Sequence, residues 1–259
     1  MLSYRLPQWL RRISPGVRGS KRLAPSPHAE ALRTLSQFKH PPLAGDRASL
    51  LVEPDARISF DAGHGGTDPG AQHNGIVESS LNLALARYAK LRLEHSYEPV
   101  AVALTRTTDE YLSLRERGEA SERQQADLVV SIHCNAATST AQHGAMAFAL
   151  PGDIAALDVA RTILRCMPKP LNCGTRYAFS ADADADTDSG RNGVWLQRVR
   201  NVLSPHYPRC AVLLEVGYLS HIGDARALEC PAVQSGIVTA IMAGVDRYRR
   251  IVADSRRAG

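Results

Sequence analysis

The amino-acid sequence predicts an α/β fold, a mainly parallel open twisted sheet of about six strands with helices on both faces. From Ile58 onward, short apolar runs alternate with longer stretches of helical periodicity, the pattern of repeated strand–helix–strand units. The chain has 259 residues, of which 44% are hydrophobic and 22% charged. This composition is typical of a globular chain that buries a sizeable core.

Five short apolar runs are predicted to be strands. In chain order they are Ile58 to Asp61, Val100 to Leu104, Leu128 to Ile132, Ala145 to Leu150 and Ala211 to Val216.

Helices are predicted between these runs and after the last of them. Ser113 and Glu116 form a capping box, which predicts that a helix begins there and runs toward Gln125. The other helices are recognised by apolar residues that recur on one face. They are predicted at Ser79 to Leu93, Ile154 to Met167 and Ala232 to Tyr248.

The net charge of +5 comes from the N-terminal part of the chain. Residues 1–57 hold ten Lys and Arg against four Asp and Glu, which leaves 21 against 22 for the remainder. We therefore divide the chain into a flexible basic arm (1–57), a folded domain (58–250) and a short C-terminal tail (251–259). Since a nucleic-acid groove needs basic charge on the folded part, no nucleic-acid partner is expected.

Composition excludes other classes of protein. No long uncharged apolar run is present, so no integral membrane segment is expected. Five scattered cysteines do not make a disulfide scaffold. The arm lacks the apolar stretch and cleavage site of a secretory signal, and its Arg-rich composition leaves a transit peptide as an alternative to a mobile tail.

Residues that can carry chemistry follow the predicted strands. Ligands of open α/β sheets bind at the carboxyl ends of the strands, where loops from several strands meet. His64 follows the first strand, His133 the third, and Glu215 lies within the fifth. Two imidazoles and a carboxylate are therefore expected at one rim.

Each of these residues also has a structural interpretation. A single histidine near a strand end is more often a hydrogen-bonded structural group than a ligand. Glu78 is also an ordinary acidic residue for a first helical turn. Glu215 is different, because in an apolar stretch its carboxyl must be protonated, paired or near a cation. Together, the four fit a catalytic zinc site with three N/O ligands, an open position for water and a free carboxylate as base.

Three stretches of the sequence resemble one enzyme family. They are SFDAGHGGTDPGAQHNGIVESSLNLALA, LTRTTDEYLSLRERGEASERQQADLVVSIHCNA and AVLLEVGYLSHIGDARAL. They are similar to the zinc-dependent N-acetylmuramoyl-L-alanine amidases of the amidase-3 type, in matching order over roughly Ile58 to Tyr248. The resemblance implies that His64, Glu78 and His133 bind Zn²⁺ and that Glu215 is the catalytic carboxylate.

The resemblance also implies the substrate, peptidoglycan, cut at the amide between N-acetylmuramic acid and L-alanine. The site of action is then periplasmic or extracellular, although no recognisable signal peptide gives the export route. Two alternatives stay open. They are a zinc hydrolase of another peptide or acyl-amide, and a non-catalytic cell-wall-binding module.

The sequence departs from the family pattern at Ala62, Cys134 and His221, where Pro, a small residue and Asn are usual. Cys134 is either a fourth ligand or a small buried residue, and we favour the latter because neighbouring strand residues face opposite sides. Asp61 and Asn135 are candidates to orient the imidazoles.

The segment from Ile154 to Gly193 combines a helix with an acidic stretch. Asp182 to Asp188 alternate as in a calcium loop, but the required Gly and Glu are missing, so an EF-hand is rejected. The stretch is expected to be a solvated loop, with a flap over the crevice as the alternative. An autoinhibitory role remains a hypothesis.

Overall fold

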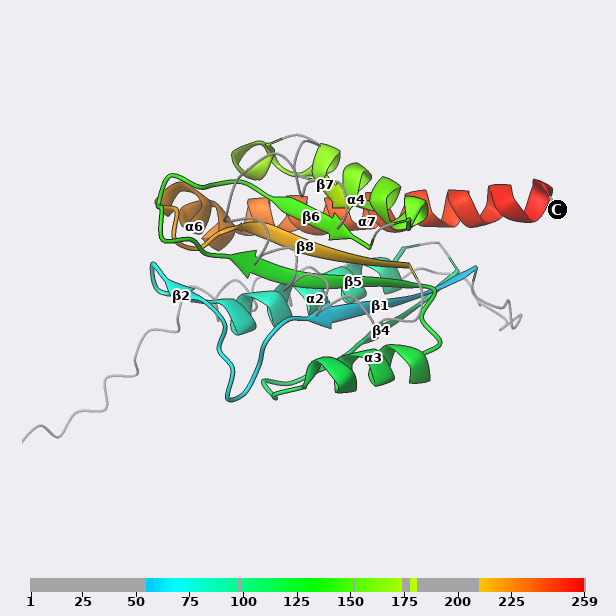
Figure 1. The fold of residues 1–259 in the computed structure, drawn as a ribbon, viewed down its shortest axis with the longest axis horizontal. Coiled ribbons are helices and arrows are strands. Elements are labelled where there is room, and N and C mark those ends of the chain that lie inside the picture. The colour runs from blue at the N-terminus through cyan, green and yellow to red at the C-terminus, as the bar shows by residue number, and fades with distance from the viewer. Residues whose placement is uncertain (1–54, 97–98, 151, 174–177, 181–209, 259) are drawn as a thin grey trace, which may run out of the picture. The chain divides into compact units, whose positions relative to one another are not determined.

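The computed structural model describes residues 55–96, 99–150, 152–173, 178–180 and 210–258, and these form one α/β unit (Figure 1). Its six-stranded sheet has the order β4-β1-β5-β8-β6-β7. The first four strands are mutually parallel, β6 is antiparallel to β8, and β7 is parallel to β6. They are β4 (Val100–Leu104), β1 (Ala56–Ala62), β5 (Leu128–Asn135), β8 (Cys210–Tyr218), β6 (Met146–Ala149) and β7 (Ala178–Ser180).

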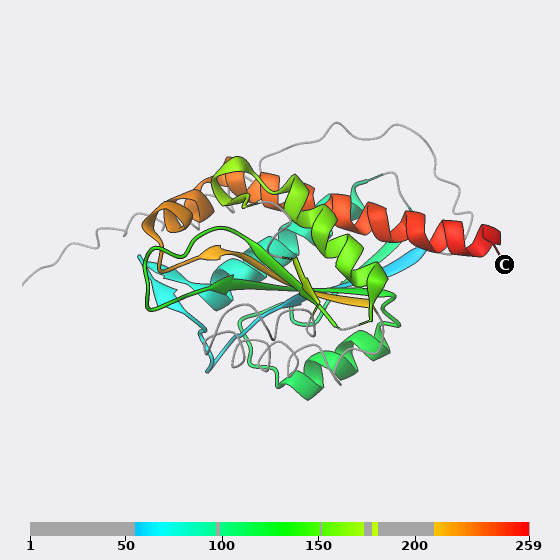
Figure 2. The same ribbon diagram turned by 45° about the horizontal axis from the view of Figure 1, so that its top comes forward.

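Helices cover both faces of the sheet, which confirms the predicted fold class. α2 (Glu78–Glu94), α4 (Ile154–Cys166) and α7 (Pro231–Ala258) contribute to the main apolar core. Figure 2 shows α3 (Leu114–Arg123) on the opposite side of the sheet from α4 and α7. Side chains alternate along β5: Leu128 and Val130 belong to the main core, while Val129 belongs to a smaller cluster with Phe148 and Leu213.

The strands that carry the site are longer than predicted. β5 continues past Ile132 to Asn135, and β8 continues past Val216 to Tyr218. His133 in β5 and Gly217 in β8 interrupted the apolar pattern on which the prediction rested, although β5 and β8 stay paired as far as Asn135 and Tyr218, with a register shift after His133. His133 is consequently a strand residue, as Glu215 was already predicted to be, and both are held by the sheet.

The helix predictions differ mainly at the ends. The capping box is present, since Glu116 N–H donates to Ser113 Oγ and Ser113 N–H donates to the Glu116 carboxylate. The last helix was predicted to end at Tyr248, before a tail over 251–259, but α7 continues to Ala258. This last part of the helix contains ion pairs between its own residues, such as Arg250–Asp246. Its high charge had been interpreted as the sign of a solvated tail.

Several short elements were not predicted. They are β2 (Gln72–His73), β3 (Ile76–Val77), the 3₁₀ turn η2 (Lys169–Leu171), β7 and α6 (Ile222–Glu229). Strands of two or three residues are too short to show a periodicity. The β2–β3 hairpin did have a signal, because Asn74-Gly75 occupies the turn with positive φ at both residues.

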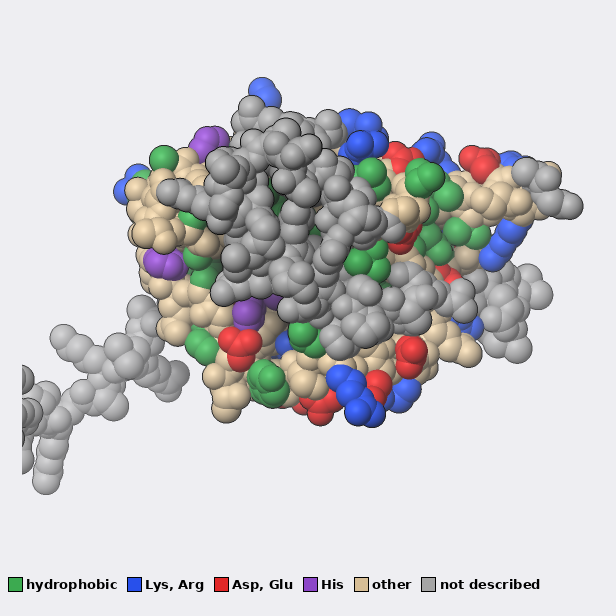
Figure 3. Space-filling model, viewed as in Figure 1, with side chains coloured by type: hydrophobic (Ala, Val, Ile, Leu, Met, Phe, Trp, Pro, Cys, Tyr) green, Lys and Arg blue, Asp and Glu red, His purple; other side chains and the backbone are tan. Residues whose placement is uncertain are grey.

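Other predictions fall outside this description or concern the surface. Residues 1–54, most of the predicted arm, and the acidic stretch from Asp182 to Asp188 lie outside the described residues. All five cysteines are free thiols. Basic and acidic side chains are interspersed on the face drawn in Figure 3.

No described helix is, by itself, both long and apolar enough to cross a membrane. Among the described helices, α6 and α7 reach the required length and composition only when taken together, and they are bent by 87° at their junction.

Candidate metal centre and active site

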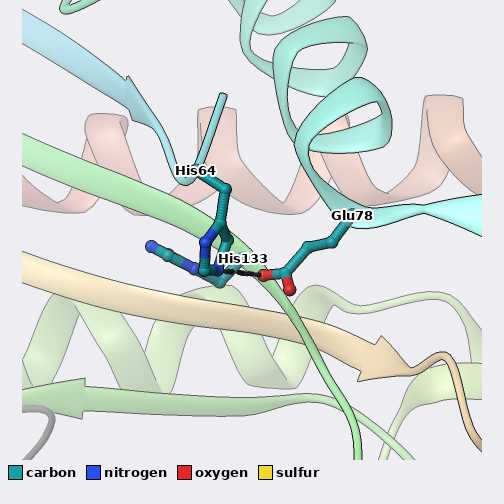
Figure 4. A group of neighbouring side chains, drawn as sticks. All are labelled: His64, Glu78 and His133. Carbon is teal, nitrogen blue, oxygen red and sulfur yellow. Dashed lines mark hydrogen bonds and ion pairs between the residues drawn. The ribbon is translucent and has the colours of Figure 1, made fainter. Parts of the chain in front are cut away.

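Three of the predicted site residues meet beyond the carboxyl ends of neighbouring strands. His64 follows β1, His133 lies in β5, and Glu78 is the first residue of α2. One ligand atom from each lies within 4.8 Å of the other two. Figure 4 shows the two imidazoles and the carboxylate approaching one another from separate segments. The structure thus brings together three side chains that are far apart in the sequence.

The carboxylate of Glu78 lies between the two imidazoles. Its Oε1 is 3.2 Å from His64 Nε2 and 3.1 Å from His133 Nδ1. The ring centroids of His64 and His133 are 5.0 Å apart, and the ring planes are nearly perpendicular. Backbone N–H groups also fix the carboxylate, because Cys134 donates to Oε1 at 3.0 Å and Ala71 donates to Oε2 at 2.8 Å. Both oxygens are therefore oriented by the protein.

The charges of this cluster support one another. Burial acts to raise the pKa of Glu78, but the hydrogen bonds and charges of His133 and His64 outweigh it and hold that pKa well below its usual range. Burial acts to lower the pKa of His64, but Glu78 and Asp68 raise it to about 9. Glu78 is thus an anion at neutral pH, next to two groups that interact favourably with it.

Glu215 faces the same region from β8. It is paired in register with His133 on β5, so the two side chains leave the sheet on the same side. Glu215 is 7% exposed, and among the described residues nothing donates a hydrogen bond to its Oε2. Burial and the negative charge of Glu78 raise its pKa well above the usual range, against the opposing effect of His64. Such a carboxyl is suited to exchange protons near neutral pH.

The loop that carries His64 has an unusual backbone. His64 adopts φ +58°, in the left-handed region, which an L-residue occupies only when the surroundings hold it there. Gly70 has φ +67°, and a Cβ on it would lie 2.6 Å from Glu78 Oε2 and 2.7 Å from His64 Cδ2. Only glycine leaves room for both ligand side chains at this point.

A buried ion pair supports the base of this loop. Arg117 Nη1 donates to Asp61 Oδ1 and to the Ala62 carbonyl, both at 2.7 Å, and Arg117 Nη2 donates to the His64 carbonyl at 2.9 Å. Asp61 also accepts from Thr105 and Ser131. Burial acts to raise the pKa of Asp61, but the charge of Arg117 and these hydrogen bonds lower it to about 2.

The carboxylate that orients the His64 ring is that of Asp68, which was not predicted from the sequence. Asp61 and Asn135 were the candidates, but Asp61 binds Arg117, Thr105 and Ser131, and the Asn135 side chain contacts Met146 and the Ala136 N–H. Asp68 Oδ2 lies 2.8 Å from His64 Nδ1 instead. Its place four residues after His64 was the available signal.

Cys134 belongs to the main core, as the alternation along the strand predicted. Its side chain is 3% exposed, and the thiol donates to Asn82 Oδ1 at 3.4 Å. Burial and the charge of Glu78 raise the pKa of the thiol, which disfavours a thiolate ligand. Another family departure, His221, caps the N-terminus of α6 by accepting from the Asp224 N–H.

Comparisons with known proteins identify the family of this chain. Residues 58–247 match the amidase-3 family, described as N-acetylmuramoyl-L-alanine amidase. The sporulation-specific N-acetylmuramoyl-L-alanine amidase of Bacillus subtilis is 31% identical over 173 residues, which are 67% of this chain and 60% of that protein. The YqiI protein of Bacillus subtilis is 30% identical over 206 residues, covering 74% of this chain and 84% of that protein.

Solved structures show the same fold. The catalytic domain of CwlV, an N-acetylmuramoyl-L-alanine amidase from Bacillus (Paenibacillus) polymyxa, gives a TM-score of 0.60 at 27% identity and covers 74% of this chain and 97% of that one. The amidase AmiC2 of Nostoc punctiforme gives 0.61 at 26% identity, over 76% and 98% of the two chains.

Proposed function

This chain belongs to the amidase-3 family of N-acetylmuramoyl-L-alanine amidases, and we propose that it is a zinc-dependent enzyme that cuts peptidoglycan. The bond would be the amide between N-acetylmuramic acid and the L-alanine of the stem peptide. The observation that carries the proposal is the convergence of His64, Glu78 and His133 within 4.8 Å, with Glu215 in register beside His133.

The donor set fits zinc. Two imidazoles and one carboxylate are the ligands of many catalytic zinc sites, which keep a fourth position open. Glu78 is anionic and buried, and Asp68 orients the His64 ring from its other nitrogen, as carboxylates commonly do for histidines that bind metals. Zinc in such a site acts as a Lewis acid and lowers the pKa of bound water from 15.7 to about 7.

Glu215 would move the protons. An amide nitrogen is a poor leaving group unless it is protonated, so hydrolysis needs a group that first removes a proton from water and then delivers it to nitrogen. Glu215 Oε2 is buried and free of hydrogen bonds from the described residues, and the raised pKa of this carboxyl suits both steps. Glu78, whose pKa is lowered, is suited instead to stay ionised as a ligand.

The substrate sets the place of action. Peptidoglycan lies outside the cytoplasmic membrane, so the reaction would occur in a periplasmic or extracellular space. The residues of the cluster specify the type of reaction, hydrolysis, more closely than they specify a substrate that contains a sugar. The test must therefore distinguish peptidoglycan from other amides.

The decisive experiment compares two substrates with and without metal. Purified protein is incubated with intact muropeptides and with free stem peptides, and the products are identified by mass spectrometry. We expect free stem peptides beginning with L-alanine to be released from muropeptides, no cleavage of the free peptides, loss of activity with a chelator and recovery with zinc. Cleavage of the free peptides would point to a different amide hydrolase, and binding to peptidoglycan without cleavage to a wall-binding module.

A further inference from the structure

Arg106 is a buried arginine that the proposed chemistry does not use. It follows β4, is 1% exposed, and is the largest fully buried side chain among the described residues. Burial and the positive charge of Arg117 lower its pKa. A guanidinium in such a place is costly unless its N–H groups are satisfied, so its partners show what it is for.

The hydrogen bonds of Arg106 within the described chain go to backbone carbonyls on both sides of the cluster. Nε donates to Ala62 at 2.8 Å, and Nη2 donates to Gly63 at 3.0 Å and to Ser79 at 2.8 Å. Nη1 donates to Thr108 at 2.9 Å, which anchors the guanidinium to its own loop. Ala62 and Gly63 directly precede His64, and Ser79 directly follows Glu78.

We propose that Arg106 is a positioning residue that fixes the separation of His64 and Glu78 by bridging the backbone segments that carry them. The proposal rests on the proposed function, because the group that needs this separation is the zinc ion. Arg106 acts through the backbone, since it donates to the carbonyls of residues that adjoin the two ligands, Ala62, Gly63 and Ser79.

The bridge needs the planar fork of an arginine. One nitrogen, Nη2, donates to the Gly63 and Ser79 carbonyls, while Nε of the same guanidinium donates to the Ala62 carbonyl. The ammonium of lysine is a compact charge on a flexible stem and does not reproduce that geometry. Arg117 differs in its place, because its bonds to Ala62, His64 and Asp61 lie on the His64 side of the cluster.

The left-handed backbone of His64 explains why a bridge is useful. A residue at φ +58° is held there by its surroundings, and release of the loop would let His64 move away from Glu78. Asn82 provides a second, longer link, since its Nδ2 lies 3.3 Å from the Gly63 carbonyl and 3.5 Å from Glu78 Oε1. The shorter bonds of Arg106 carry most of the constraint.

The test measures zinc affinity and stability in the same variants. Zinc dissociation constants are obtained by chelator competition, and melting temperatures are recorded with and without zinc. For Arg106→Lys we expect at least ten-fold weaker zinc binding and a smaller rise in melting temperature on adding zinc. The matched control is Leu164→Ala in the core of α4, which lowers the melting temperature but leaves zinc affinity unchanged.

The outcomes separate the two proposals. Equal zinc affinity in Arg106→Lys and the wild type would overturn the positioning role alone, and so would a loss no larger than that of Leu164→Ala. A wild-type protein that does not bind zinc would overturn the proposed function as well. If Arg106→Lys does not fold in buffer, all three proteins are titrated in trimethylamine N-oxide, which favours the compact state, and the same comparison decides.

Discussion

The two halves of the site are positioned in different ways. His133 and Glu215 lie on neighbouring strands in register, so the pairing of β5 with β8 places them. His64 lies on a loop with a left-handed backbone, held by Arg117, by Asp68 and by the closely packed Gly70. The strand half depends on the sheet as a whole, whereas the loop half depends on a few named contacts.

Substitutions in the two halves should therefore impair the site in different ways. A change in a functional group of the strand half leaves the backbone in place and removes chemistry. A change in the contacts around the loop moves a ligand and weakens metal binding while the sheet stays folded. Activity and zinc affinity, measured in the same variants, therefore distinguish the halves.

The largest effect is expected from Glu215→Gln in the strand half. The amide has nearly the same shape but cannot accept and return the proton, so turnover of muropeptides should fall about 1,000-fold. Zinc affinity should stay within about three-fold of the wild type, because Glu215 is not among the three clustered ligands. Initial rates and bound zinc are measured on the same preparation.

Met146→Leu is the matched control, since Met146 pairs with Glu215 in register on β6 and the exchange conserves volume. Its turnover should remain close to that of the wild type. Full activity in Glu215→Gln would mean that another group moves the proton.

The fold was predictable where the pattern was long. Apolar periodicity gave the class and three of the helices, because burial against a sheet imposes a period on the sequence, and the capping box at Ser113 gave a fourth. The missing elements were short, such as β2 and β3 with two residues each. The last residues of β5 and β8 were not predicted, because their place in the sheet depends on the pairing of the two strands. Local periodicity carries no information about such contacts.

The residues of the site also fall into two groups, those that the sequence pattern predicts and those that it does not. His133 and Glu215 were predictable from their places at strand ends, and Glu215 also from its apolar neighbours. Of the residues that support His64, only Asp68 had a sequence signal, its place four residues further along the chain. Arg106 comes from a different segment, 42 positions along the chain from His64, and only the folded chain brings its guanidinium to the loop.

The next largest effect is expected from a pair of glycine substitutions in the loop half. Gly70→Ala and Gly75→Ala place an L-residue at φ +67° and +81°, which costs each variant about 1–2 kcal/mol of stability. Only at Gly70 does the new Cβ meet ligand side chains, since nothing lies within 4 Å at Gly75.

We therefore expect zinc binding to weaken about 100-fold in Gly70→Ala and to stay unchanged in Gly75→Ala, as measured by chelator competition. Gly75→Ala is the control for backbone strain. Equal losses in the two variants would show that strain, and not the space around His64 and Glu78, governs the loop.

The smallest effect concerns the ion pair beneath the loop and is read from pH. The pKa of Asp61 is lowered from 3.8 to about 2 in the folded protein, so the unfolded chain takes up the proton first as the pH falls. The ionised carboxylate contributes about 2 kcal/mol to the free energy of unfolding, and this contribution is fully present above about pH 4 and lost as the pH falls toward 2.

Asp61→Asn leaves Arg117 buried without this charge, so the variant should be less stable than the wild type at pH 6. Urea unfolding of the metal-free proteins should show that the difference in unfolding free energy between the wild type and Asp61→Asn shrinks by about 2 kcal/mol as the pH falls from 5 to 2. A constant gap would mean that Asp61 supports the His64 loop through hydrogen bonds that an amide replaces, and that its charge is not needed.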